Sequence, residues 1–477
     1  MPTASNKETV SEPPSEDSEG SEAEDQQDLP PGPDYDQINL LMPDKPTDGD
    51  KDSSSLNAEI QHAPLLDGSM ITADTAHLLP QYGFFGMRAK SPLFFNTNVP
   101  FSAFICGVQG SGKSHTTSCI LENALIPSRS LGRLESPLSA LVLSYGHFGS
   151  GGVGFSISEA AYLVAPHRDF PKHPSVKRVT VLVSPSNFHN IAPLYTRIKN
   201  VTVLPMKLKP ERLDVNTMLT LMAVDLTAEP PLYLVQVQGI LRSMAEEGRG
   251  FNYMQFKKRL EQCNFNPAQK QMLDMRLGQL DSFLDLGNTF QEPQYRPGEI
   301  TIMDMSCPFV DANTACIMFK LGLQRYLQSR ASGKMVVLDE AHKYMLDLPG
   351  THALNSELLQ VIRLQRHYGS RVIISTQEPT LLTDLIALCS VSVIHRFSSP
   401  EWFAALKRHI PMASQSHETL LRDIEGLKTG TALAYSPNAV FGRDGEGALM
   451  KGMGTFVRVV VRKRATWDGG VSVLASA

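Results

Sequence analysis

The sequence predicts an α/β fold with a mainly parallel β-sheet, a helical insertion and β-strands near the C-terminus. Apolar runs typical of buried strands alternate with helical stretches from about residue 96 to about residue 410. Between about residues 210 and 290 this alternation gives way to helical spacing alone. From about residue 428 to residue 464 strand-like segments return, and GTFVRVVVRKR is the clearest of them.

Seven segments have the length and composition of buried strands. Helical stretches separate most of them, and this alternation is typical of a parallel sheet covered on both faces. The segments are FSAFICG (101–107), SALVLSYG (139–146), RVTVLVSPS (178–186), GEITIMDMS (298–306), KMVVLDE (334–340), SRVIISTQ (370–377) and VSVIHRF (391–397).

The insertion is predicted from two sets of apolar residues at helical spacing. Residues at positions i, i+3, i+4 and i+7 line one face of a helix, which can then be buried. The first set runs from 237 to 244 and the second from 273 to 284; together they are Val237, Ile240, Leu241, Met244, Leu273, Leu277, Leu280 and Leu284.

The charge of the chain changes sharply near residue 60. Residues 1–60 carry 16 acidic and 3 basic side chains, whereas the rest carries 33 acidic and 41 basic ones, so the net charges are −13 and +8. The acidic stretch has few large apolar residues and should be disordered; it either only aids solubility or competes with an anionic partner for the basic body. We therefore expect a tail at 1–60, a lead-in segment at 61–95, one domain at 96–465 and a C-terminal tail at 466–477.

The composition argues against a membrane or secreted protein. The sequence shows no secretory signal and no apolar run near the length of a bilayer span. Its six cysteines form no C-x-x-C pair, which is typical of reduced thiols. We expect an intracellular protein of the nucleus or the cytoplasm, without a membrane partner.

A glycine-rich loop follows the first buried strand. GVQGSGKS fits the pattern G-x-x-x-x-G-K-[ST] at every fixed position, and a helical stretch follows it. The glycines let such a loop curl with its N–H groups toward phosphate oxygens, and the next helix presents its positive end to the same anion. We therefore predict that a nucleotide is bound by Gly107, Val108, Gln109, Gly110, Ser111, Gly112, Lys113, Ser114 and His115.

Two acids after a later strand complete the predicted site. The Lys113 ammonium is expected to reach the β- and γ-phosphates, and the Ser114 hydroxyl to ligate Mg²⁺. In KMVVLDEAHKYM, Asp339 and Glu340 follow a buried strand. We expect Asp339 to hold the same Mg²⁺ and Glu340 to orient and deprotonate the attacking water. The second acid favours hydrolysis over simple nucleotide binding.

A glutamine and an arginine are the remaining candidates. Gln377 ends the strand RVIISTQ, where its amide can sense the γ-phosphate or the attacking water. Charge that develops on the γ-phosphate needs a cation, and an arginine from a neighbouring subunit would make the enzyme an oligomer. We favour Arg396 and Arg366 among four candidates, which are Arg363, Arg366, Arg371 and Arg396.

Two further patterns are interpreted as coincidental. GSGGVG (149–154) fits G-x-G-x-x-G, but no helix clearly begins after it, so a flexible loop is expected. DEAH (339–342) matches the name of a group of RNA helicases, whose other motifs are not apparent in this sequence.

The order of these motifs resembles the HerA/FtsK superfamily of P-loop ATPases over about residues 96–465. STQEP and HRFSSPE are the segments most particular to HerA-like proteins. The resemblance implies a RecA-like core, ATP and Mg²⁺ as ligands, a hexameric ring and DNA as the substrate of a motor. It also implies that Lys113 and Ser114 bind ATP and Mg²⁺, that Asp339 and Glu340 serve hydrolysis and that Gln377 senses the γ-phosphate. The N-terminal β-barrel usual in HerA proteins is not predicted here.

Two functions remain open from the sequence. The first is a ring ATPase that moves along DNA, for which the basic segment VRVVVRKRA could contact phosphates through Arg458, Arg462, Lys463 and Arg464. The same residues could instead form the charged edge of a sheet. The second function is a nucleotide switch that assembles with protein partners and is not a motor.

Overall fold

The computed structural model describes residues 51–146, 157–210, 213, 218, 232–248, 251–287, 290, 292–409 and 417–469. By its internal contacts the chain divides after Asp52, and the architecture below belongs to the unit that begins at Ser53. The acidic tail lies outside the described residues except for residues 51–60, which belong to helix α2 (Lys51–His62). The segment GSGGVG and residues 470–477 also lie outside them.

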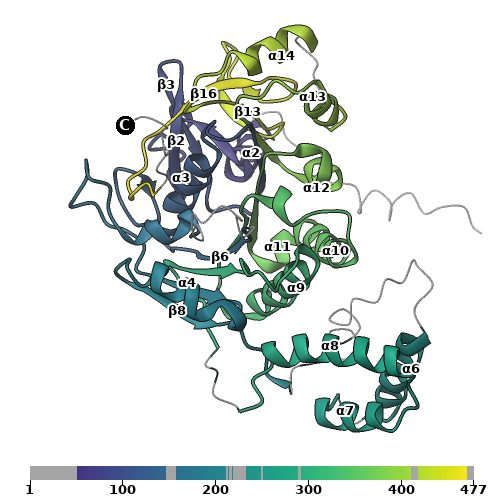
Figure 1. Ribbon diagram of the computed structural model, residues 1–477. Helices are drawn as coiled ribbons and strands as arrows, with labels where there is room; N and C mark the ends of the chain where they lie inside the picture. Colours follow the sequence, from purple (N-terminus) through teal and green to yellow (C-terminus); the bar gives the residue numbers. More distant parts are fainter. Residues whose placement is uncertain are drawn as a thin grey trace, which may run out of the picture. The chain divides into compact units, whose positions relative to one another are not determined.

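Eight neighbouring strands form the parallel part of one large sheet (Figure 1). Their order is β12-β4-β11-β10-β6-β9-β7-β8, and each neighbouring pair is parallel. The predicted α/β class with a mainly parallel sheet is confirmed. Seven of these strands were predicted, and β8 was not. Their bounds are β4 (Ser102–Cys106), β6 (Ser139–Ser144), β7 (Arg178–Val183), β8 (Val201–Pro205), β9 (Glu299–Asp304), β10 (Lys334–Leu338), β11 (Ser370–Thr376) and β12 (Val391–Ile394).

The central parallel strands are mostly apolar because both faces of the sheet are covered. Alternate residues of β4 belong to different cores: Phe104 lies in one cluster and Ile105 in the other. Helices α9 (Ala312–Gln328) and α10 (Pro349–Arg363) supply buried residues to the first cluster. Helix α3 (Lys113–Leu125) supplies them to the second. Helix α3, which follows the glycine-rich loop, is therefore held by its buried face against one side of the sheet.

In the described part of the predicted insertion there are three helices, α6 (Leu232–Glu246), α7 (Tyr253–Glu261) and α8 (Pro267–Phe283). Helix α8 begins with a capping box in which Asn266 and Gln269 exchange hydrogen bonds. Seven of the eight apolar residues predicted to face inward are buried, and Ile240 is half-buried. They join the same core as α9 and α10.

Beyond β12 neighbouring strands of the sheet are paired antiparallel, except for β1 and β14, which are parallel. The predicted C-terminal strands are present, and the lead-in segment adds three more that were not predicted. The order from β12 outward is β13-β16-β2-β3-β1-β14-β15. The bounds are β1 (Leu65–Asp67), β2 (Tyr82–Arg88), β3 (Ser91–Phe95), β13 (Thr431–Tyr435), β14 (Val440–Arg443), β15 (Leu449–Lys451) and β16 (Val457–Val461).

A buried ion pair joins the segment after β16 to helix α3. Arg462 donates to the Glu122 carboxylate at 2.6 Å, to the Cys119 carbonyl at 2.9 Å and to the Asn123 amide oxygen at 2.9 Å. Burial alone would raise the pKa of Glu122, but Arg462 and a hydrogen bond from Thr466 lower it below its ordinary value. Because these charges are paired inside the protein, we expect the segment after β16 and helix α3 to unfold together.

We predict that Arg462→Met destabilises the protein by about 3–5 kcal/mol, because it leaves Glu122 buried without its cation. Urea unfolding followed by circular dichroism measures the change. Lys463→Met is the matched control; the side chain of Lys463 is 80% exposed, so its loss should change stability by less than about 0.5 kcal/mol. Equal unfolding midpoints for the two variants would contradict this account.

Candidate nucleotide site

The phosphate loop turns between the end of β4 and the start of α3. Three of its glycines have positive φ angles, of +153° at Gly107, +72° at Gly110 and +112° at Gly112. Residues other than glycine rarely adopt such φ angles, which explains why the motif has glycine at these three positions. Gly112 is the N-cap of α3, so the loop leads directly into the positive end of that helix.

His395, which sequence analysis did not single out, supports the loop from behind. Its backbone N–H donates to the Cys106 carbonyl at 2.8 Å, and its Nε2 lies 2.9 Å from the Thr116 hydroxyl. A Cβ built on Gly107 would lie 2.6 Å from the Cβ of His395. Burial and the nearby Lys113 lower the pKa of His395 to about 4, so the ring is neutral near pH 7. The only sequence signal for this role is its position near the end of the predicted buried strand 391–397.

Three of the predicted catalytic and phosphate-binding side chains meet in the structure. The Lys113 Nζ lies 3.7 Å from Glu340 Oε1, and the Gln377 amide donates to Glu340 Oε2 at 2.6 Å. Glu340 has a φ of +47°, an unusual conformation for a residue with a side chain. Such strain persists where the surroundings fix a side chain in one direction. Here it directs the Glu340 carboxylate to a position between Lys113 and Gln377.

The charges of the site perturb one another. Burial, Glu340 and Glu159 raise the pKa of Asp339 to about 7. Burial lowers the pKa of Lys113, while Glu340 and Cys106 act in the opposite direction. Shifts of this kind are common where a charged ligand completes a site, because the ligand's own charges restore the balance. A bound cation would favour the ionised form of Asp339.

The residues present fit a magnesium ion that is bound together with phosphates. No group of three or more His, Cys, Asp or Glu side chains suited to a metal occurs in the described part of the chain. Magnesium does not need such a cage, because in nucleotide sites one or two protein oxygens, water and the phosphates hold it. Ser114, in the first turn of α3, and Asp339, directly after β10, can supply those oxygens.

The other predicted loop residues differ in exposure. Gln109 and Gly110 are exposed at the tip of the loop, Val108 is half-buried and Ser111 is buried. The Val108 N–H donates to the Arg396 carbonyl at 3.0 Å, which ties the loop to the end of β12. The His115 ring turns to the C-terminal segment, since its Nε2 lies 2.8 Å from the Arg462 carbonyl.

The candidate arginines lie at opposite edges of the sheet. Arg396 is exposed directly after β12, at the edge where the phosphate loop lies. Arg366 is exposed in helix α11 (Gln365–Tyr368), which precedes β11 and therefore lies at the other edge. Arg363 ends α10 shortly before it. Arg371 is buried and donates to the Thr97 carbonyl, so it has a structural role. Arg366 therefore lies away from the candidate nucleotide site of its own chain.

Two of the four basic residues of VRVVVRKRA are too buried for the contact with DNA phosphates that the sequence leaves open. Arg462 and Arg464 are buried, with 8% and 2% of their surface exposed. Arg458 lies 3.6 Å from Asp423, and Lys463 is the most exposed of the four. Both buried arginines lie after β16, and Arg462 is buried because its guanidinium pairs with Glu122 of α3.

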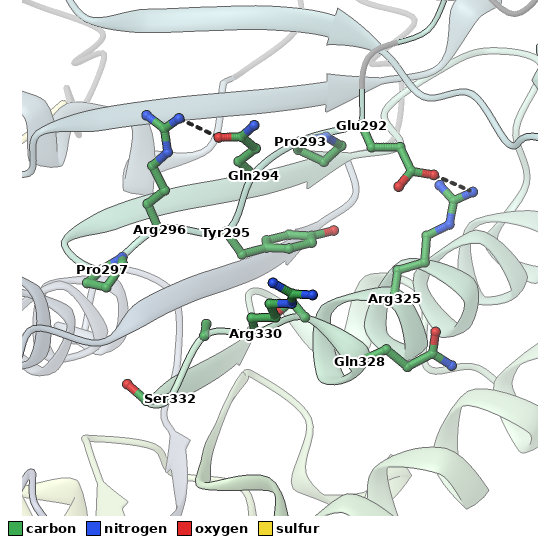
Figure 2. A pocket seen from close by; sticks show the side chains of 12 residues that line it. Glu292, Pro293, Gln294, Tyr295, Arg296, Pro297, Arg325, Gln328, Arg330 and Ser332 are labelled. Atoms are coloured by element: carbon green, nitrogen blue, oxygen red, sulfur yellow. Dashed lines mark hydrogen bonds and ion pairs between the residues drawn. The ribbon is translucent and has the colours of Figure 1, made fainter.

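A pocket lies at the edge of the sheet where β9 and β10 begin. Figure 2 shows Tyr295 near its centre, with Arg330 beside it and Arg325 paired with Glu292. It encloses about 630 Å³ and belongs to the segments 292–297 and 325–332. Parallel strands place this edge opposite the phosphate loop, so the pocket is separate from the candidate nucleotide site.

No model of a known protein family matches the chain, and no curated protein matches it. Several solved structures resemble it. VirB4 of Thermoanaerobacter pseudethanolicus is 13% identical, with a TM-score of 0.48 over 80% of this chain and 96% of that one. The bacterial conjugative coupling protein TrwB is 12% identical, with a TM-score of 0.42 over 84% and 95%. The genome packaging NTPase B204 of Sulfolobus turreted icosahedral virus 2, solved with AMPPCP, is 10% identical, with a TM-score of 0.28 over 74% and 96%.

These likenesses concern the fold. The order of the strands and the course of the phosphate loop are what establish the fold of this chain. Within the described residues, no helix has the length and apolar character that crossing a bilayer requires.

We predict that Gly107→Ala weakens nucleotide binding by at least about tenfold, because its methyl group would collide with His395 and displace the loop. Calorimetric titration with ATPγS measures the affinity. Gly239→Ala, in helix α6, is the control, since a Cβ there meets no atom within 4 Å. Wild-type affinity in the Gly107 variant would show that the loop does not need this contact.

Proposed function

We propose that this chain is an ATPase that binds ATP with Mg²⁺ and hydrolyses the bond between the β- and γ-phosphates, which yields ADP and inorganic phosphate. The observation that supports this most is the position of Glu340, held by Gln377 at 2.6 Å and facing Lys113 at 3.7 Å. A protein that only binds a nucleotide has no need of a carboxylate in that place. We name ATP rather than GTP as the nucleotide because the motifs resemble those of HerA/FtsK ATPases.

The roles of the side chains follow from their chemistry. The N–H groups of the loop and the Lys113 ammonium bind the phosphates, and for this Lys113 must exchange Glu340 for phosphate oxygens. Glu340 then accepts a proton from the attacking water, and the Gln377 amide fixes the direction of the carboxylate. Ser114 and Asp339 would hold the magnesium ion, which offsets the negative charge of the phosphates.

We further propose that hydrolysis drives a ring-shaped motor, a hexamer, along DNA without sequence preference. The resemblance to HerA/FtsK proteins and the net charge of +8 outside the tail support this. The position of Arg366 fits it as well, because an arginine at the far edge of the sheet can serve only the nucleotide of a neighbouring subunit. In a ring, such an arginine would link the subunits to hydrolysis.

One observation favours a nucleotide switch with protein partners instead. The helical insertion exposes three methionines: Met254, Met272 and Met275 are 64%, 46% and 69% exposed. Met272 and Met275 are one helical turn apart on α8 and can form one apolar patch. Flexible methionines on a surface are typical of protein-binding sites.

Lys113→Ala should abolish ATP binding, because the loop loses its only lysine. Glu340→Gln should bind ATPγS within about threefold of wild type and lower kcat by about 10²–10⁴ fold, since the general base is lost. Filter binding and phosphate release measure the two quantities. A Glu340→Gln variant that hydrolyses ATP at the parent rate would remove Glu340 from the mechanism.

The motor and the switch differ in their response to DNA. If the chain is a motor, double-stranded DNA should stimulate ATP turnover severalfold, and the stimulation should fade as salt rises from about 50 to 200 mM. A rate of ATP turnover that neither DNA nor RNA changes at any salt concentration would support the switch. A mass measurement in the presence of ATPγS shows whether the ring forms.

A further inference from the structure

His342 lies beside Glu340 and Gln377, the two side chains that face the proposed place of hydrolysis. It belongs to the short helix η5 (Ala341–Lys343), which directly follows Glu340. The backbone N–H of Gln377 donates to the Nδ1 atom of His342 at 3.3 Å, and its Nε2 atom lies 3.6 Å from Glu340 Oε2. One ring nitrogen thus contacts the residue at the end of β11, and the other faces the proposed general base.

The hydrogen bond from Gln377 fixes the state of the His342 ring. Because Nδ1 accepts this bond, the proton of the neutral ring lies on Nε2. Burial lowers the pKa of His342, which agrees with a neutral ring near pH 7. Nε2 therefore presents an N–H group to the Glu340 carboxylate. Only 15% of the His342 side chain is exposed, so the ring has little room to turn away.

The Glu340 carboxylate loses one of its contacts when a nucleotide binds. In the structure Lys113 lies 3.7 Å from Oε1, and the Gln377 amide donates to Oε2 at 2.6 Å. Lys113 must leave the carboxylate to reach the phosphates, and hydrolysis needs a fixed base at that same stage. The positive φ of Glu340 also persists only where the surroundings hold the residue in place.

Two further donors lie within 4.0 Å of Glu340 Oε2 in the described part of the chain, and they differ in mobility. Lys343 Nζ lies 4.0 Å away at the end of a flexible side chain that is 35% exposed. His342 Nε2 lies 3.6 Å away on a rigid ring that Gln377 anchors. This distance exceeds that of a hydrogen bond, but catalytic contacts often tighten only when the substrate is bound. Release from Lys113 would let the carboxylate complete the bond to His342.

We propose that His342 is a positioning residue for hydrolysis, which links Gln377 to Glu340 and holds the Glu340 carboxylate in place after Lys113 has moved to the phosphates. This inference rests on the proposed function and adds a residue to its site. His342 acts through Glu340 and not on the nucleotide itself. Its loss should therefore lower kcat and leave the affinity for the nucleotide nearly unchanged.

The first test measures kcat for ATP and the affinity for ATPγS, both with magnesium. His342→Ala should lower kcat by about tenfold or more, because a misplaced base loses much of its effect, and should bind ATPγS within about threefold of wild type. His352→Ala is the matched control, since the His352 side chain is 69% exposed on α10. This control should leave both quantities unchanged.

Two conservative substitutions separate the two nitrogens of the ring. His342→Gln can place an amide N–H near the position of Nε2, so it should recover part of the lost kcat. His342→Asn can accept the hydrogen bond from Gln377, but its shorter side chain does not reach Glu340, so its kcat should stay low. An Asn variant with the wild-type kcat would show that only the contact with Gln377 matters, and the inference would be wrong.

A double substitution distinguishes positioning from a structural role. In the Glu340→Gln background, His342→Ala should lower the residual rate by less than about twofold, because the base through which His342 acts is already absent. A structural residue would lower the rate by the same factor in both backgrounds and would also weaken ATPγS binding, which would overturn the inference. Should His342→Ala not fold, the Gln and Asn variants decide: a higher kcat for Gln supports the inference, and equal values contradict it.

The outcomes also separate this inference from the proposed function. If Glu340→Gln loses activity while His342→Ala turns over ATP at the wild-type rate, only the inference on His342 fails. If the wild-type chain does not hydrolyse ATP, the proposed function and this inference fail together.

Discussion

The candidate site depends on the register of four parallel strands. Cys106 at the end of β4 pairs with Thr376 of β11 and with Ile394 of β12, and Leu338 of β10 pairs with Ile374. Because parallel strands end at the same edge, the residues that follow them lie side by side there. The phosphate loop, the acidic pair, Gln377 and His395 come from distant parts of the sequence and meet for this reason. A shift of one strand by one residue would turn its side chains to the other face.

A second constraint acts from the C-terminus. The segment after β16 crosses α3, and the fully buried Glu122 accepts hydrogen bonds from Arg462, Ala465 and Thr466. The same segment then pairs with residues 165–167, which follow η2. The helix that begins at Lys113 is therefore held on one side by the sheet and on another by the last strand's continuation. Charged residues of the site are held in place by other charged residues. Substitution of one of them should therefore disturb the positions of several others.

Most of the parallel sheet and of the phosphate site could be predicted, because each is encoded locally. Apolar runs mark the strands, and the glycine loop, the acids and Gln377 each follow one of them. The lead-in strands β1 to β3 were missed since β1 and β2, which flank β3, each pair with a strand near the other end of the chain, β14 and β16. His395 was missed for a related reason: no local pattern shows that this residue will be buried against the loop. The burial of Arg462 likewise depends on Glu122, far away in the sequence.

The central claim is that one magnesium nucleotide is bound where the loop, Asp339 and Glu340 meet. Calorimetric titration of the wild-type chain with ATPγS, with magnesium and then with EDTA, tests it most directly. The account predicts one nucleotide per chain with magnesium, and a markedly weaker affinity without it, because Ser114 and Asp339 then have no cation to share with the phosphates. Absence of binding heat in both titrations, or an affinity that does not depend on magnesium, would contradict it.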